Sequence, residues 1–170
     1  NDIKRIVFAS TSAIYGVADI LPTPENYGPL HPISLYGASK LACEGLVSAF
    51  AHNFDMQAWI YRFANIIGHN GTHGALVDFV RKLRQTPDRL QILGDGKQAK
   101  PYIHVSDCIN AMFYGFAHAS EEVNCYNLAV AGATSVTKIA ETVVEEMGLK
   151  NVQFEYSGGA QGWRGDVPQV

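Results

Sequence analysis

The sequence predicts an α/β fold built around a parallel sheet, and three segments in its first 70 residues carry this prediction. The run RIVFAS at residues 5–10 and the run AWIYRFANIIG at residues 58–68 are apolar and rich in β-branched and aromatic side chains, as buried strands are. Between them, apolar side chains recur at helical spacing from Leu35 to His52 or Asn53. Strand, helix and strand in this order form a right-handed unit with parallel strands.

A polar and proline-rich connection separates the first expected strand from the helix. Residues 10–16, with the sequence STSAIYG, are expected to turn at the end of the strand. Four prolines follow between residues 22 and 32. Because proline lacks a backbone N–H and fixes φ, this stretch is expected to be irregular.

Residues 69–170 differ in texture from residues 1–68, and we expect them to form mainly a smaller α/β domain, with some segments returning to the main sheet. The clearest helix lies here, because apolar residues from Val136 to Met147 follow the helical period, with Ser135 as N-cap and Gly148 as stop. The other expected elements are a helix at 75–85, a strand from Leu90 with a turn at 94–96 and a second extended piece, a helix at 107–118 capped by Asp107, and a strand at 125–130.

The composition is that of a globular protein rather than of a disordered or fibrous one. Of the 170 residues, 47% are hydrophobic and 17% are charged, which suffices for a packed core. A net charge of −3 without any Lys/Arg-rich run argues against binding to nucleic acid or to an anionic membrane, since both need clustered positive charge. The sequence contains no signal-peptide pattern and no apolar run of about 20 residues, so we expect neither export nor membrane insertion.

The cysteine and histidine patterns predict neither disulfides nor a metal site. Cys43, Cys108 and Cys125 are widely spaced and odd in number, and the sequence has no C-x-x-C pair. Such cysteines fit a reduced, cytoplasmic protein. His69 and His73 have i, i+4 spacing, but a glycine between them and the lack of a nearby carboxylate argue against zinc, so we expect no metal.

The stretch YGASK at residues 36–40 contains the first candidate for chemistry. On a helix, Tyr36 and Lys40 lie on one face, four positions apart, so the ammonium group can approach the phenol. A free phenol has a pKa of about 10 and acts as a base at neutral pH only where nearby positive charge favours the phenolate. The same spacing also occurs in many helices that have no catalytic role.

Three hydroxyl residues, Ser10, Thr11 and Ser12, stand at the end of the first expected strand. Ligands bind at the carboxyl ends of strands in open α/β sheets, and the following helix can bring side chains to the same edge. A hydroxyl beside a phenol therefore suggests shared hydrogen bonding to a substrate oxygen. The alternative interpretation is an ordinary turn rich in serine and threonine.

Five segments together resemble the extended short-chain dehydrogenase/reductase family of NAD-dependent epimerases and dehydratases. They are FASTSAIYG followed 21 residues after its tyrosine by YGASK, then YRFANIIG, KPYIHVSD and GWRGDVP. They span nearly the whole chain in the family's order, and their combination is far more specific than any one of them. Within the family, the chain is most similar to the archaeal-type UDP-glucose 4-epimerases. The resemblance implies a Rossmann-type parallel sheet for residues 1–68 and a nucleotide-sugar-binding domain beyond it.

The resemblance also implies residue roles. Tyr36 would be the acid/base at the sugar 4-hydroxyl, and Lys40 would hold the nicotinamide ribose of NAD and favour the phenolate. Thr11 would complete the catalytic triad by a hydrogen bond to the reacting oxygen. Ser10 and Phe63 would contact the cofactor together with Tyr36 and Lys40.

For the substrate, the resemblance implies contacts from Thr11, Asn65, Lys100, Arg164 and Asp166. Asn65 is otherwise a turn residue at a strand end, and Asp166 is otherwise a solvated carboxylate. Lysine at position 100 replaces the arginine usual in the family, which keeps the charge but loses the bidentate fork.

Other departures from the family pattern also concern the substrate site. Pro101 replaces an aspartate and stiffens the loop. Trp163 stands where many epimerases carry another phosphate-binding arginine. Whether Trp163 or Arg164 faces the ligand is therefore left open by the sequence.

The residues after Thr11 favour one reaction within the family. Ser12 and Ala13 stand where 4,6-dehydratases carry an Asp-Glu pair, so elimination of water would lack its acid and base. We therefore expect interconversion of UDP-glucose and UDP-galactose through a 4-keto intermediate. The alternatives are another sugar-nucleotide enzyme, namely a 4,6-dehydratase, reductase or uronate epimerase, or a non-catalytic sugar-nucleotide-binding protein.

The chain lacks the glycine-rich G-x-x-G-x-x-G turn that binds the cofactor pyrophosphate in this family. The glycines of GHNGTHG at residues 68–74 have the wrong spacing, and we expect that segment to be a loop near the substrate phosphates. The first expected strand also begins close to Asn1, although a buried parallel strand needs neighbours on both sides. We therefore interpret the chain as the C-terminal half of a longer enzyme, a homodimer when complete, and expect the half alone to be inactive.

Overall fold

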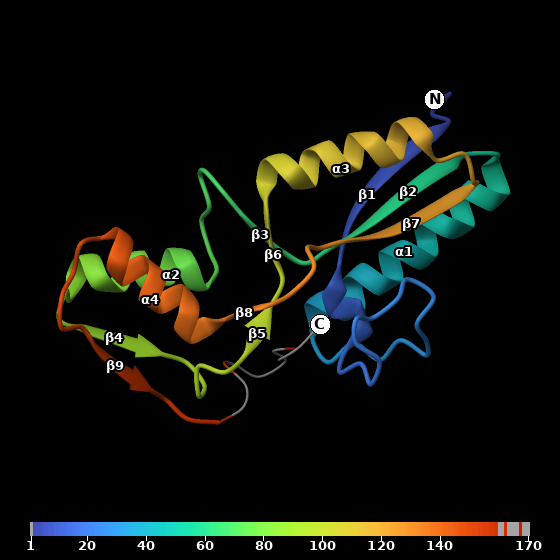
Figure 1. Ribbon diagram of the computed structural model, residues 1–170. Helices are drawn as coiled ribbons and strands as arrows, with labels where there is room; N and C mark the ends of the chain where they lie inside the picture. Colours follow the sequence, from blue (N-terminus) through green and yellow to red (C-terminus); the bar gives the residue numbers. More distant parts are fainter. Residues whose placement is uncertain (1, 160–161, 163–166, 168–170) are drawn as a thin grey trace.

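The computed structural model describes residues 2–159, 162 and 167, and in Figure 1 they form two groups of layers side by side. One group surrounds a three-stranded sheet with a helix on each face. The other packs two helices over a short two-stranded sheet. The predicted α/β class is therefore confirmed.

The main sheet has the strand order β1-β2-β7 and is parallel throughout. Its strands are β1 (Arg5–Thr11), β2 (Gln57–Phe63) and β7 (Val123–Leu128). Five consecutive residues of the central strand β2 are buried, as expected for a strand covered on both faces. In β1, only Ser10 and Thr11 are buried, because β1 is the edge strand of this sheet within the described residues.

Helix α1 (Leu35–Phe54) covers one face of this sheet; it begins where its apolar spacing predicts and ends one or two residues later than predicted. Ser34 caps it by accepting a hydrogen bond from the Gly37 N–H at 3.0 Å. Its buried side chains Val47 and Ala51 pack against Ala58 and Ile60 of β2. This packing places the N-terminal turn of α1 beside the carboxyl end of β1.

Helix α3 (Val105–His118) covers the opposite face, over a cluster that includes Trp59, Tyr61 and Cys108. The prediction that Asp107 caps this helix was wrong, because the cap is His104. The His104 Nδ1 atom accepts from the Ser106 N–H at 3.3 Å, so the helix begins two residues earlier than expected. Asp107 lies in the first turn, where a negative charge interacts favourably with the helix dipole.

The predicted single strand at residues 58–68 is divided between two sheets. β2 ends at Phe63, and β3 (Asn65–Ile67) pairs with β6 (Tyr102–His104) in a separate parallel ladder. The Ala64 N–H still donates to the carbonyl of Leu128, whereas the Asn65 N–H donates to the carbonyl of Pro101. The chain therefore changes hydrogen-bonding partner between consecutive residues.

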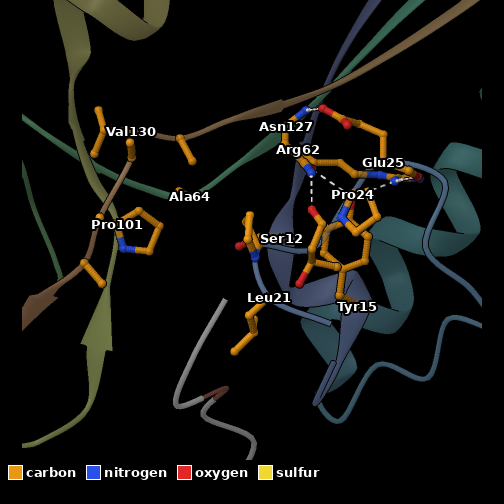
Figure 2. A pocket seen from close by; sticks show the side chains of 16 residues that line it. Ser12, Tyr15, Leu21, Pro24, Glu25, Arg62, Ala64, Pro101, Asn127 and Val130 are labelled. Carbon is orange, nitrogen blue, oxygen red and sulfur yellow. Dashed lines mark hydrogen bonds between the residues drawn. The ribbon is translucent and has the colours of Figure 1, made fainter. Parts of the chain in front are cut away.

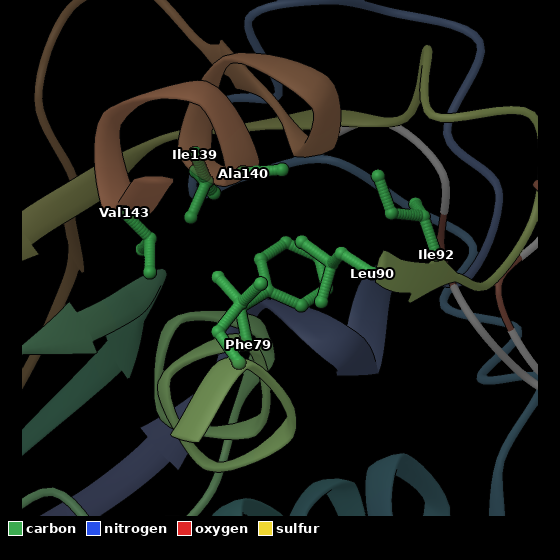
Figure 3. Close-up of a cluster of buried hydrophobic side chains, with 7 residues drawn as sticks. Phe79, Leu90, Ile92, Ile139, Ala140 and Val143 are labelled. Carbon is green, nitrogen blue, oxygen red and sulfur yellow. The ribbon is translucent and has the colours of Figure 1, made fainter. Parts of the chain in front are cut away.

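The second group of layers is held by its own apolar core, shown in Figure 3. Helices α2 (Ala75–Gln85) and α4 (Val136–Glu146) contribute Phe79, Leu83, Ile139, Ala140 and Val143, and strand β4 (Arg89–Ile92) contributes Leu90 and Ile92. β4 pairs in parallel with β9 (Gln153–Tyr156), and β5 (Ala99–Lys100) pairs with β8 (Thr134–Ser135) in antiparallel fashion.

The predicted ends of α4 are confirmed within one residue. Ser135 accepts from the Lys138 N–H at 3.1 Å, as expected of the N-cap. The helix ends at Glu146, and Gly148 follows with a positive φ of 67°. Glycine adopts this conformation at little cost, which is why it ends helices so often.

The part of the chain described here contains no helix with both the length and the apolar character needed to span a bilayer. It also contains no group of three or more His, Cys, Asp or Glu side chains arranged to hold a metal ion. The three cysteines are free thiols.

Candidate active site

The three candidate catalytic residues come together at the carboxyl end of β1. Thr11 is the last residue of β1, and Tyr36 and Lys40 lie on the first turns of α1. The Lys40 Nζ atom donates to the Ala9 carbonyl at 2.8 Å and lies 5.9 Å from the centroid of the Tyr36 ring. The ammonium group is thus held between the strand and the phenol.

Thr11 and Tyr36 line one cavity of about 470 Å³, together with Ser10 and Phe63. Tyr36 is 55% exposed, so its ring borders this space rather than the protein core. The remaining walls come from β3, from the start of α2 and from residues of the 68–74 loop, namely Gly68, Gly71, His73 and Gly74. Thr11 and Tyr36 thus border the same space, so a ligand bound there would contact both residues.

Gly37 permits the close approach of α1 to the end of β1. A Cβ atom at this position would lie 2.6 Å from the Ala13 carbonyl oxygen and 3.1 Å from the Pro32 Cβ. The glycine in YGASK therefore lets the helix bearing Tyr36 touch the turn that follows Thr11.

Asn65 and Lys100 border a second cavity, of about 340 Å³, which adjoins the first. Asn65 and Tyr102 line both cavities. The Asn65 side-chain nitrogen lies 3.5 Å from the Pro101 carbonyl, to which its backbone N–H also donates. Lys100 is the last residue of β5 and sits on the wall of the second cavity.

Gln98 also lines the second cavity and was missed by sequence reasoning. Its side chain is 5% exposed, and its nitrogen donates to the Leu93 carbonyl at 3.2 Å. Its oxygen is buried and has no hydrogen-bond partner among the described residues. Because a buried unpaired acceptor is costly, this oxygen is suited to receive an N–H group from a ligand. A lone glutamine in a loop gives no sequence signal for this role.

Arg164, Asp166 and Trp163, three of the residues expected at the substrate site, lie outside the described residues. Their place relative to the two cavities therefore stays a prediction. Gly162, just before them, lines the second cavity.

A buried polar network behind the first cavity was not foreseen from the sequence. Glu44 of α1 and Arg62 of β2 form an ion pair of 2.8 Å, and both are less than 10% exposed. Arg62 also donates to the Tyr15 hydroxyl at 2.9 Å and to the Glu25 carbonyl at 2.8 Å. Two weak signals could have indicated it: a glutamate one helical turn after Lys40, and an arginine inside an otherwise apolar strand.

The network fixes the charge on Arg62. Burial disfavours a charged guanidinium, but the hydrogen bonds with Glu44 and Tyr15 outweigh it and raise the pKa of Arg62. Burial raises the pKa of Tyr15, against the lowering effect of Arg62. The pKa of the nearby Cys125 thiol is raised to about 11, again chiefly by burial, so this cysteine is an uncharged thiol at neutral pH.

A third cavity, of about 600 Å³, lies on the other side of Ala64 and is shown in Figure 2. Tyr15, Arg62 and Asn127 form its polar wall, linked by the hydrogen bonds drawn there. Ala64 lines both this cavity and the one beside Tyr36. Ser12 also faces it, whereas Thr11, the preceding residue, faces the first cavity.

Comparison with known proteins identifies what the chain is similar to. Residues 1–129 match the family model described as the NAD dependent epimerase/dehydratase family. Over 154 residues the chain is 30% identical to a protein of Methanocaldococcus jannaschii named "Putative UDP-glucose 4-epimerase", covering 88% of this chain and 49% of that protein.

Two solved structures share the fold. A crystal structure of UDP-galactose 4-epimerase has a TM-score of 0.85 and 34% identity over 98% of this chain and 52% of that protein. MoeE5, solved with UDP-glucose and NAD, has a TM-score of 0.83 and 29% identity over 98% of this chain and 54% of MoeE5. The chain therefore spans about half the length of the proteins it matches.

Proposed function

Because the chain belongs to the NAD-dependent epimerase/dehydratase family, we propose that the complete protein is a nucleotide-sugar epimerase that interconverts UDP-glucose and UDP-galactose through a 4-keto intermediate. Membership confirms the predicted family and Rossmann-type fold, and it identifies NAD as the family's cofactor. The observation that carries the proposal is the shared cavity of Thr11 and Tyr36, with the Lys40 ammonium beside the phenol.

In this proposal, the residues of the first cavity handle one proton. Tyr36 takes the proton of the sugar 4-hydroxyl and returns it, while Thr11 holds the same oxygen by a hydrogen bond. Lys40 stabilises the phenolate and binds the nicotinamide ribose, and Ser10 and Phe63 complete that side of the cofactor site. Bound NAD would supply the reversible acceptor for the two electrons that leave the sugar.

The second cavity holds the nucleotide diphosphate while the 4-keto sugar rotates in the first cavity. Asn65 and Lys100 offer an amide and a cation to the phosphates, and Arg164 and Asp166 add to this grip. The buried Gln98 oxygen supports placing the base here, because a uracil ring carries an N–H group that it can accept. Firm binding of the nucleotide is needed because a released 4-keto sugar would leave the cofactor reduced.

The lining of the first cavity supports epimerisation over dehydration. Among the described residues that line it, none is an aspartate or a glutamate. A 4,6-dehydratase needs such a carboxyl pair to remove water, and the two positions that would carry it hold Ser12, which faces the third cavity, and Ala13.

A uronate epimerase is the second candidate. MoeE5 has also been solved with UDP-glucuronic acid and NAD, at 29% identity to this chain. The two sugars differ at C6, so the choice depends on the shape and charge of the sugar pocket.

The test is turnover by the full-length protein. With UDP-galactose as substrate we expect UDP-glucose as product, and we expect Tyr36→Phe to lower kcat by about 10²–10⁴-fold. Tyr114→Phe is the matched control, because Tyr114 lies on α3, is 67% exposed, stacks on His118 and is not among the residues that line the cavity beside Tyr36.

Three other results have defined meanings. Turnover of UDP-glucuronic acid alone would favour the uronate epimerase, and binding without turnover would favour a non-catalytic protein. Unaltered kcat in Tyr36→Phe would refute the role given to this tyrosine.

We also propose that the complete enzyme is a cytoplasmic homodimer. The free thiols at positions 43, 108 and 125 fit a reducing compartment. The dimer contact is expected along α1.

A further inference from the structure

We propose that Glu44 is a positioning residue, whose buried carboxylate holds the helix bearing Tyr36 and Lys40 in register with the ends of β1 and β2. The inference rests on the proposed function, because it concerns how the geometry of that site is set. Glu44 does not line the cavity beside Tyr36, so it acts through other residues rather than on the substrate.

The carboxylate of Glu44 contacts both neighbouring strands at once. Its Oε1 atom accepts from the Ser10 hydroxyl at 2.5 Å and from the Arg62 Nε at 3.1 Å. Its Oε2 atom accepts from the Arg62 Nη2 at 2.8 Å and from Nε at 3.2 Å. Ser10 and Arg62 are register partners in the β1–β2 ladder. The carboxylate therefore bridges a single rung of the sheet.

This rung lies directly before the residues of the site. Thr11 follows Ser10, and Phe63 follows Arg62. On the helix, Glu44 lies one turn after Lys40, whose ammonium donates to the Ala9 carbonyl. Two successive turns of α1 are thus joined to Ala9 and Ser10 by directional contacts. Together they set both the rotation of the helix and its position along the strand.

Apolar packing alone would not set this geometry. Val47 and Ala51 already hold the later turns of α1 against β2 through contacts that tolerate small shifts. A buried ion pair, by contrast, adds little net stability over apolar side chains of similar size, but it demands a defined geometry. Along α1, Glu44 lies between Val47 and the first turns, which carry Tyr36 and Lys40. The position of these turns decides where the two candidate catalytic side chains lie.

Arg62 also binds the short 3-10 helix after β1, η1 (Ser12–Tyr15), and the loop that follows it. Its Nη1 atom donates to the Tyr15 hydroxyl and to the Glu25 carbonyl, and Tyr15 in turn donates to the Asn127 side chain at 2.8 Å. Figure 2 shows these groups converging from β2, β7 and the loop. Arg62 is therefore held in place by contacts other than the one with Glu44. As a result, the ion pair fixes α1 against a side chain that cannot easily move.

Two variants of the full-length protein test the proposal at saturating NAD. Glu44→Gln keeps the shape of the side chain but removes its charge, and Ser10→Ala removes the link to β1 while leaving the ion pair. For each we expect kcat with UDP-galactose to fall about 10–100-fold, because a misplacement of about 1 Å costs a factor of this order. The KM is expected to change less than about 2-fold, since the nucleotide is held by the second cavity.

The second measurement needs no catalysis. We expect the ¹³C-methyl resonance of Thr11 to shift in the full-length Glu44→Gln variant, because the Glu44 carboxylate holds Ser10, the residue before Thr11. Glu141→Gln is the matched control: Glu141 is an exposed glutamate on α4 whose ion-pair partner among the described residues is Lys138 at 3.6 Å, and its loss should leave kcat and the Thr11 resonance unchanged.

The outcomes separate this inference from the proposed function. Unchanged kcat and an unchanged Thr11 resonance in Glu44→Gln would overturn the positioning role, as would a loss of activity that matches the loss of folded protein. If Glu44→Gln does not fold, Glu44→Asp, which keeps the charge but shortens the side chain, is measured in the same way, and an unchanged kcat and Thr11 resonance would again overturn the role. An inactive wild-type protein would refute the proposed function, whereas the Thr11 resonance would still report on the positioning role of Glu44.

Discussion

At the scale of single residues, Gly37 and Gly45 of α1 make a matched pair. A Cβ on Gly37 would meet the Ala13 carbonyl oxygen at 2.6 Å, whereas a Cβ on Gly45 would have nothing within 4 Å. We expect Gly37→Ala to lower the free energy of unfolding by about 1–3 kcal/mol, because the helix must move away from the turn. Gly45→Ala should raise it by up to about 1 kcal/mol, since alanine favours the helix.

Urea unfolding of the two full-length variants measures both values. Because the first turn of α1, which would be displaced, carries Tyr36, the Gly37→Ala variant should also have a lower kcat under conditions where it is fully folded. Equal stability of the two variants would show that α1 does not approach the turn as closely as described.

The candidate catalytic pair could be predicted from the sequence, whereas the buried ion pair could not. Tyr36 and Lys40 could be identified because their spacing on one helix face is a local pattern. Glu44 has the same spacing from Lys40, yet its importance depends on Arg62, which lies 18 residues further on. Whether a polar residue is buried, and against what, is a property of the folded chain and not of its neighbours in sequence.

At the scale of elements, α1 carries an apolar stripe on the side turned away from the sheet. Leu46, Phe50 and Phe54 are spaced four residues apart and are 60%, 53% and 57% exposed. Because exposed apolar stripes of this kind mark interfaces, we expect α1 to pair with a second copy in the complete protein. Phe50→Glu should convert the dimer to a monomer, as measured by light scattering after size exclusion.

Val17→Glu is the control for this change, since Val17 is equally exposed but lies in the loop after β1. A Phe50→Glu variant that remains dimeric, or a wild-type protein that is monomeric, would contradict the assignment of the interface to α1.

Most elements could be predicted from local patterns, and the failures have a common cause. The extent of α1 and the cap of α4 follow from apolar period and a capping serine, both of which are short-range. The break at Ala64 could not be predicted, because it exists only where Asn65 meets Pro101, 36 residues away. The two-residue strands β5 and β8 are likewise too short to leave a periodic signal.

At the scale of the whole molecule, this chain by itself is expected to be inactive. It contains the proposed catalytic residues but no G-x-x-G-x-x-G turn for the cofactor pyrophosphate, and it spans about half the length of its relatives. With UDP-galactose and added NAD, we expect no UDP-glucose from residues 1–170 alone, and turnover from the full-length protein under the same conditions. Turnover by the isolated chain would contradict this expectation.

The passage of the backbone between the two groups of layers has a mechanical consequence. The described chain crosses between them after β2, again between β6 and α3, and again between β7 and β8. If a protease cleaves the chain at one of these crossings, the other two still join the two groups of layers covalently. Because the backbone crosses at three places, any movement of one group against the other must be accommodated at all three crossings together.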